Sequence, residues 1–316
     1  MSELPIKIEL PEHFLDEEVR WNYTVSREMK KIWAIELDLL AELLSVCKKH
    51  DIQIFGDGGT ILGAVRHKGY IPWDDDIDLM MMRDQYDRLC EVAAEEFQPP
   101  YFFQTEYTDP GSLRGHAQLR NSLTTGIRKI EMENHYQFNQ GIFIDIFPLD
   151  AAPDDPEDLR QIQNRTSELI TRARANARKT TRYYPAKSVI RRPFKKLANL
   201  LLSGKLGDLT GFNSIYDQYE AECRRYNGTK TEKVAKYFST KAIKKQQVWK
   251  REWFDSAIDL PFEFLSIPVP AGYEEILDLF FGDWRTPLQI SSGHGGLIFD
   301  TSRSYTQYLG ELKERQ

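Results

Sequence analysis

Cysteine is scarce in this chain of 316 residues, which contains only Cys47, Cys90 and Cys223. The three are far apart in sequence and form no Cys-x-x-Cys pair, so we expect neither a structural zinc site nor a disulfide framework. We interpret Cys47 and Cys90 as small buried apolar residues. This cysteine usage fits a reducing compartment, and we predict a cytoplasmic protein.

Long apolar runs are also missing. No uncharged stretch approaches the ~20 residues that a membrane-spanning helix needs, and residues 1–9 lack the basic and apolar regions of a signal peptide. Any membrane contact is therefore expected to be peripheral, at the inner face of the membrane. Hydrophobic residues still make up 41% of the chain, which is enough for a folded globular protein. The net charge of -6 gives no overall sign of nucleic-acid binding.

Acidic residues are absent from Leu169 to Gly207, whereas eleven lysines and arginines lie between Arg172 and Lys205. Leucines and Phe194 are interleaved with these cations. A basic amphipathic stretch of this kind can lie on an anionic membrane surface. The other interpretation is the solvated face of a helix, and the sequence leaves both open.

Apolar periodicity predicts the main elements. Helical spacing predicts a long amphipathic helix over Ser26–Lys49, and short apolar runs between turn residues predict strands at Ile52–Phe55, Ile77–Met81 and Gly141–Phe147. We expect Pro148 and the Asp/Pro-rich residues after it to end the third strand. Asp84 is the expected N-cap of its helix. Further helices are predicted at Thr60–Arg66, Asp84–Phe97, Glu157–Lys179, Ile215–Tyr226 and Gly272–Phe281.

Two acidic residues flank an isoleucine in Asp76-Ile77-Asp78. On a strand, side chains two positions apart lie on the same face, with Cα atoms about 6.6 Å apart. Carboxylates this close repel each other, and a divalent cation would supply the compensating charge. Hard ions prefer such oxygen ligands. The pattern therefore predicts a site for Mg²⁺ or Mn²⁺, of a kind that recurs in phosphoryl transfer.

A third acidic residue, Asp145, stands within an otherwise apolar run at 141–147. A charged side chain in a buried strand needs a partner. We predict that neighbouring strands bring Asp145 to Asp76 and Asp78, so that all three are metal ligands and catalytic residues. Asp74 and Asp75 have a simpler interpretation as solvated turn residues.

Glycines follow the first predicted strand, in Gly58-Gly59-Thr60. Glycine lets the backbone approach a phosphate closely, and the start of a helix presents free N–H groups to an anion. Three candidate cations for phosphate oxygens come next, although an exposed basic turn is the other interpretation. They are Arg66, His67 and Lys68.

The motifs together resemble those of a known family. Residues 56–78, GDGGTILGAVRHKGYIPWDDDID, resemble the signature of the LicD family. Residues 141–150, GIFIDIFPLD, are similar to its second block, and residues 120–124, RNSLT, are similar to a weaker block between the two. The stretch from Tyr273 through residues 281–284 to His294 resembles its C-terminal pattern.

The resemblance implies an α+β protein with a nucleotidyltransferase-like fold, in which a small mixed sheet flanked by helices is joined to a mainly helical second region. We expect a catalytic core at 1–156, a helical and basic substrate region at 157–270, and a C-terminal helix and loop at 271–316 that complete the active site. Carried over by position, Asp76, Asp78 and Asp145 hold the metal. Gly58, Gly59 and Thr60 hold the donor phosphates, with Arg120 as a further candidate contact.

Bacterial members of the family resemble enzymes that move phosphocholine from CDP-choline onto cell-surface glycans such as lipopolysaccharide or teichoic acid. Fukutin-related proteins transfer ribitol phosphate from CDP-ribitol and carry zinc, which the cysteines of this chain do not support. We therefore predict a metal-dependent phosphocholine transferase that acts on a glycan or lipid-linked glycan. The alternatives are a nucleotidyltransferase, which would move NMP from an NTP to a phosphosugar or small molecule, and a non-catalytic binding module.

Two further predictions concern the edges of the site. His294, in Ser-Ser-Gly-His-Gly-Gly, is a candidate acid, base or phosphate partner, and an incidental role is equally open. Aromatic faces attract ammonium groups, so four aromatic residues are candidate walls for a choline headgroup, with core packing as the other interpretation of each. They are Trp73, Tyr107, Tyr136 and Trp284.

Overall fold

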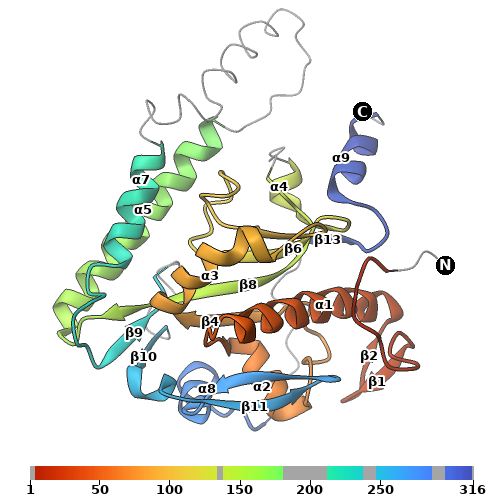
Figure 1. The fold of residues 1–316 in the computed structure, drawn as a ribbon, viewed down its shortest axis with the longest axis horizontal. Coiled ribbons are helices and arrows are strands. Elements are labelled where there is room, and N and C mark those ends of the chain that lie inside the picture. The colour runs from red at the N-terminus through yellow and green to blue at the C-terminus, as the bar shows by residue number, and fades with distance from the viewer. Residues whose placement is uncertain (1–3, 134–137, 181–211, 238–246, 287–295, 315–316) are drawn as a thin grey trace, which may run out of the picture.

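A computed structural model describes residues 4–133, 138–180, 212–237, 247–286 and 296–314. The long helix predicted near the N-terminus is α1 (Arg27–Lys49), and it packs against the central sheet (Figure 1). Ser26 caps it, because the Ser26 hydroxyl accepts a hydrogen bond of 3.2 Å from the amide of Met29. The predicted amphipathic stripe is buried, from Ile32 to Cys47.

Seven strands of the described chain form the central mixed sheet, in the order β10-β9-β8-β4-β3, with β6 also paired to β8 and β5 paired to β6. Only β4 and β8 run parallel to each other; the other pairs are antiparallel. The strands are β3 (Phe55–Gly56), β4 (Asp78–Met82), β5 (Tyr101–Gln104), β6 (Ala117–Asn121), β8 (Ile142–Ala152), β9 (Lys233–Ala235) and β10 (Val248–Lys250).

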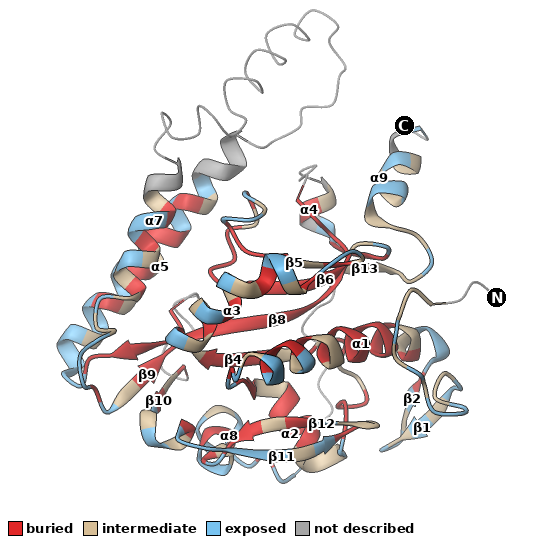
Figure 2. Cartoon of the chain, in the orientation of Figure 1, coloured by how far each residue is buried: buried red, intermediate tan, exposed pale blue. Residues whose placement is uncertain are grey.

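Strand β8 is the longest of the sheet, and all eleven of its residues are buried (Figure 2). Our prediction that Pro148 ends this strand was wrong. On one edge, β8 pairs with β6 as far as Ile146 and with β9 from Asp150 onward. Pro148 falls between these two partners, where its missing N–H interrupts no pairing on that edge.

The predicted helices are present, with shifted ends. They are α2 (Gly58–His67), α3 (Arg83–Glu96), α5 (Pro156–Thr180), α7 (Phe212–Cys223) and α8 (Tyr273–Phe281). The N-cap of α3 is Met82 and not Asp84. Asp84 lies in the first turn, where a carboxylate still interacts favourably with the helix dipole.

Several short elements were not predicted. Strand pairs form between β1 (Glu18–Arg20) and β2 (Tyr23–Val25), between β7 (Thr125–Arg128) and β13 (Leu297–Asp300), and between β11 (Ala257–Phe262) and β12 (Leu265–Pro270). The other elements are α4 (Lys129–Glu133), η4 (Arg251–Phe254) and α9 (Tyr305–Glu314).

Buried residues form two hydrophobic clusters. The larger one joins α1 and the sheet, and the smaller one lies between α5 and α7, which run side by side (Figure 1). Cys47 is buried as predicted, whereas Cys90 is only partly buried. No helix of the described chain combines the length and apolar character that a membrane crossing requires. Most of the basic stretch at 172–205 lies outside the described residues.

Candidate active site

The parallel pairing of β4 and β8 places Asp78 directly opposite Asp145. Backbone hydrogen bonds fix this register, since the amide of Asp145 donates to the carbonyl of Ile77 at 3.0 Å. The amide of Asp78 donates to the hydroxyl of Thr60 at 2.8 Å, which ties the strand to the first turn of α2. Two of the three predicted ligands therefore lie side by side at one end of β4.

Asp76 lies in the extended segment just before β4. Along residues 74–79, half-buried aspartates alternate with buried residues, as expected when one face of an extended chain points into a site. The carboxylates of Asp74, Asp75 and Asp76 each offer an oxygen, and these oxygens lie within 4.8 Å of one another. Asp75 is only 8% exposed, so our interpretation of it as a solvated turn residue was wrong.

Burial and neighbouring carboxylates disfavour the ionised forms of several acidic groups in the site. Burial and the charge of Asp78 raise the pKa of Asp76 well above its usual value. Burial and the charge of Asp145 do the same for Asp78. Glu36 of α1, also buried, has a raised pKa because of its burial and the charges of Asp75 and Asp74. An all-oxygen donor set with this excess of negative charge fits a hard divalent cation.

Asp145 differs from the other carboxylates because polar partners surround it. Its Oδ1 lies 3.0 Å from Nε2 of His116 and accepts a hydrogen bond of 2.5 Å from the Gln118 amide. Burial alone would raise the pKa of Asp145, but the contact with His116 and the charges of Arg114 and Arg128 hold it below its usual value. Asp145 is therefore kept ionised, as a metal ligand must be.

Arg120 is linked to Asp145 through the side chain of Gln118. Its side chain is fully buried and donates to the Gln118 side chain, to Gln104 Oε1 at 2.7 Å and to the Gly141 carbonyl at 2.6 Å. Gln118 in turn donates to Asp145. The structure places Arg120 in a hydrogen-bonded chain that orients Asp145, rather than in the glycine loop.

The glycine loop forms the N-terminal end of α2, next to the acidic residues. Gly58 has a φ of +46°, which favours glycine. A Cβ atom at Gly59 would lie 2.9 Å from Oδ2 of Asp74, so a larger residue here would have to displace that carboxylate. Thr60 is buried, and its hydroxyl accepts a hydrogen bond from the Asp78 amide. The structure thus brings the predicted phosphate loop and the acidic residues together.

The three candidate cations after this loop lie at the other end of α2. Nε of Arg66 donates to Nε2 of His67 at 2.9 Å, and Arg66 Nη1 donates to the Trp284 carbonyl at 2.9 Å. Burial and the charge of Arg66 lower the pKa of His67 to about 4. His67 is therefore neutral at pH 7 and does not supply the positive charge we assigned to it. Lys68 is the exposed left-handed C-cap of α2.

Several residues of the site were missed from the sequence. His116 and Gln118 contact Asp145 from β6 or the residue before it. The exposed Arg128, at the end of β7, interacts electrostatically with Asp145 and Asp76. Lys236, immediately after β9, forms a buried ion pair with Asp57. Nothing in their local sequence marks these residues, because each reaches the site through a strand pairing distant in sequence.

The remaining predicted residues are His294 and the four aromatic candidates for the choline headgroup. His294 and Tyr136 lie outside the described residues. Trp73 directly precedes the acidic group, and its ring lies 5.9 Å from that of Tyr23 and 6.4 Å from that of His67. Tyr107 instead packs on Tyr216 of α7. Trp284 donates its indole N–H to Asp278 at 2.7 Å.

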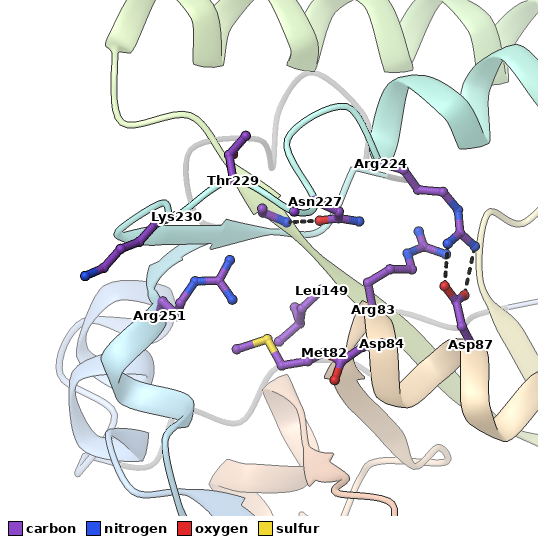
Figure 3. Close-up of a pocket in the computed structure, with 12 residues that line it drawn as sticks. Met82, Arg83, Asp84, Asp87, Leu149, Arg224, Asn227, Thr229, Lys230 and Arg251 are labelled. Atoms are coloured by element: carbon purple, nitrogen blue, oxygen red, sulfur yellow. Dashed lines mark hydrogen bonds and ion pairs between the residues drawn. The ribbon is translucent and has the colours of Figure 1, made fainter.

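A separate hollow of about 680 Å³ lies at the opposite end of β4 (Figure 3). Met82, Leu149 and Asn227 line it, and Arg224 on its wall is paired with Asp87 at 2.8 Å. None of the predicted site residues lines this hollow. The candidate active site is therefore the Asp78 end of β4, where carboxylates, a helix start and buried cations meet.

Comparison with protein families identifies one matching domain. Residues 51–166 match the family described as LicD/FKTN/FKRP, nucleotidyltransferase domain. The chain contains a LicD-family domain. The matched range includes all of α2, β4 and β8. It therefore contains the Asp74–Asp76 group, Asp78 and Asp145, but not Glu36.

Individual relatives extend the similarity beyond that domain. The lipopolysaccharide cholinephosphotransferase LicD of Haemophilus influenzae is 27% identical over 255 residues, which cover 78% of this chain and 88% of that protein. The uncharacterized protein RP689 of Rickettsia prowazekii is 33% identical over 96 residues, or 28% of this chain and 34% of that protein. The LicD-like similarity thus reaches well outside residues 51–166.

Proposed function

We propose that this LicD-family protein is a metal-dependent transferase that moves phosphocholine from CDP-choline onto a hydroxyl group of a cell-surface glycan or its precursor. The observation that carries the proposal is the meeting of Asp78, Asp145 and the Asp74–Asp76 group at the N-terminal end of α2. The choline donor and the glycan acceptor are suggested by the similarity to the lipopolysaccharide cholinephosphotransferase of Haemophilus influenzae.

The carboxylates support a metal-dependent reaction on phosphorus. Asp76, Asp78 and Asp145 are the proposed ligands, and Asp74 lies close enough to contribute. A bound Mg²⁺ or Mn²⁺ would neutralise the donor diphosphate and the charge that develops on it. In the proposed reaction, the acceptor hydroxyl releases its proton to solvent water, and its oxygen forms a bond to the phosphorus that carries choline. The bond from that phosphorus to the bridging oxygen breaks, and CMP leaves with the electron pair.

The remaining residues support binding and orientation of the donor. The first turn of α2 offers backbone N–H groups to a phosphate. Arg128 offers a positive charge near Asp76 and Asp145. Asp145 suits the ligand role better than that of a general base, because its lowered pKa makes it a weak proton acceptor.

Trp73 favours choline as the donor headgroup. Its position beside the acidic group and the ring of Tyr23 provides an aromatic surface next to negative charge. Quaternary ammonium groups are bound by such surfaces. We propose that Trp73 contacts the choline headgroup, whose positive charge the aspartates also attract.

The second candidate function is nucleotidyl transfer from an NTP, because the matched family model is itself described as a nucleotidyltransferase domain. The two reactions differ in the leaving group. Transfer from CDP-choline releases CMP, whereas transfer from an NTP releases pyrophosphate.

The purified protein should be incubated with CDP-choline or CTP, Mg²⁺ and a glycan acceptor extracted from the cell surface. We expect CMP release that depends on both metal and acceptor. Pyrophosphate release from CTP without CMP release from CDP-choline would favour the second function. The matched variants are Asp78→Asn in the site and Asp259→Asn on the exposed face of β11. Equal activity of the two variants would contradict both functions.

A further inference from the structure

Asp57 stands at the N-cap of α2 but does not cap it. Its backbone is extended, with φ −131° and ψ 154°, and aspartate is among the preferred residues at this position. Its side chain nevertheless makes no hydrogen bond to the first turn. Elsewhere in the chain, Ser26 caps α1, and Asp155 accepts from the amides of Glu157 and Asp158 at 2.9 and 3.0 Å.

The carboxylate of Asp57 is held by Lys236. The two side chains form an ion pair and are 2% and 5% exposed, respectively. The Lys236 ammonium also lies over the ring of Phe147, at 4.6 Å from its centroid, and over that of Trp249, at 5.4 Å. A buried ammonium needs a charged partner, so Lys236 and Asp57 fix each other's positions.

This ion pair leaves the start of α2 open toward the acidic residues. The amides of Thr60 and Ile61 donate to the backbone carbonyl of Asp57. For the amides of Gly58 and Gly59, no acceptor is found among the described residues. Gly59 also lies against the carboxylate of Asp74. The open amide of Gly59 is therefore next to the acidic group, where a metal-bound diphosphate would lie, and that of Gly58 precedes it at the same end of α2.

We propose that Lys236 is a positioning residue for the donor: it holds the Asp57 carboxylate away from the N-terminal amides of α2, so that the donor diphosphate can occupy them. This inference rests on the proposed function. Without Lys236, the extended backbone of Asp57 lets its side chain turn to the helix start. The carboxylate then occupies the amides and repels the phosphate.

The test compares donor binding in the full-length wild-type protein, Lys236→Met, and the double variant Lys236→Met with Asp57→Ala. Calorimetric titration with CDP-choline and Mg²⁺ should show at least tenfold weaker binding to Lys236→Met. The double variant should regain an affinity within threefold of the wild type, because no carboxylate is left to compete. In turnover, Lys236→Met should raise KM for the donor and change kcat less.

A purely structural role for Lys236 gives a different pattern. The double variant would then bind the donor no more tightly than Lys236→Met does, and that result overturns the proposal. Lys236→Met alone leaves Asp57 buried and unpaired, which can prevent folding. The double variant removes both charges, a change that buried ion pairs often tolerate. If only the double variant folds, donor affinity more than tenfold below that of the wild type overturns the proposal.

Two comparisons separate this inference from the proposed function. Lys250→Met removes a lysine of β10 whose side chain is 63% exposed, and its donor affinity should match that of the wild type. If the wild type does not bind CDP-choline, the proposed donor is wrong. The same proteins are then titrated with magnesium pyrophosphate, whose phosphates would use the same amides. Loss of pyrophosphate binding in Lys236→Met and its recovery in the double variant would support the role of Lys236, and failure to recover would overturn it.

Discussion

Asp78 and Asp145 face each other across adjacent parallel strands, although they are far apart in sequence. The pairing of β4 with β8 sets this relationship, and the bond from the Asp145 amide to the Ile77 carbonyl fixes it. A shift of one residue would turn one of the two carboxylates to the other face of the sheet. The geometry of the candidate metal site is thus a property of strand register.

Neutralising either carboxylate should remove most of the activity. We expect Asp78→Asn and Asp145→Asn each to reduce kcat on the order of 10²-fold, because each removes a proposed metal ligand. Asp259→Asn should retain wild-type turnover. CMP release measured at saturating donor checks this, and turnover by Asp145→Asn within threefold of the wild type would remove Asp145 from the proposed ligands.

Metal binding should strengthen as pH rises. Burial raises the pKa of both Asp76 and Asp78, with a further contribution from the charge of Asp78 on Asp76 and of Asp145 on Asp78, so both hold protons at higher pH than ordinary carboxyl groups. A cation must displace those protons. We expect Mn²⁺ to bind more tightly at pH 8 than at pH 6, and a chelator to abolish turnover. Electron paramagnetic resonance of free Mn²⁺ measures the affinity, and an affinity that falls with pH would contradict this picture.

His67 should remain neutral through the physiological range. Its pKa of about 4 lies below the ordinary 6.5, so between these values the unfolded chain binds a proton that the folded protein does not. The stability contributed by neutral His67 is complete above pH 6.5 and is lost as pH falls toward 4. Wild-type melting temperature should drop more than that of His67→Gln between pH 7.5 and 5. An NMR titration midpoint near 6.5 for this ring would count against the prediction.

Arg128 should contribute to donor affinity without contributing to the fold. Its side chain is exposed and interacts with the charges of Asp145 and Asp76. We expect Arg128→Met to raise KM for the donor about tenfold, through loss of a charge-assisted contact to phosphate. The neighbouring Lys129, whose side chain is also exposed, provides the control, because Lys129→Met should leave KM unchanged. Identical KM values for the two variants would place Arg128 outside the site.

The Arg83–Asp150 pair should be important for stability. Nε and Nη2 of Arg83 each lie 2.7 Å from an oxygen of Asp150, and both side chains are buried. Loss of Arg83 leaves a buried carboxylate unpaired, so Arg83→Met should lower the free energy of unfolding by about 3–5 kcal/mol. Arg160→Met, which removes an exposed pair with Glu157, should have little effect. Urea denaturation of both variants makes the comparison.

Local sequence patterns predicted the parts of the site that lie close together in the chain. Gly58, Gly59 and Asp76 belong to one continuous segment, and helical or strand periodicity placed the elements around them. Asp145 was predicted because an isolated acidic residue in an apolar run needs a partner. These inferences required only the alternation of side chains on a strand and the chemistry of carboxylates.

The site residues that the sequence did not predict are brought to the site by pairing between strands that are far apart in the chain. Lys236 reaches Asp57 only because β9 pairs with β8, and His116 reaches Asp145 only because the neighbouring β6 pairs with β8. Neither residue stands in an unusual local pattern. Pro148 was misread for the same reason: whether a proline ends a strand depends on whether a neighbouring strand needs its N–H, which the local sequence does not reveal.

The change of partners along β8 limits how the chain can be divided. Pro156 looks like a natural place to cut, because the compositional change and α5 begin there. A fragment ending at this residue would keep Asp57, Asp78 and Asp145 but lose β9, which covers the last part of β8. It would also lose Lys236, the charge partner of Asp57. We therefore expect that residues 51–166, although they contain the proposed metal ligands, do not fold stably without β9 and Lys236.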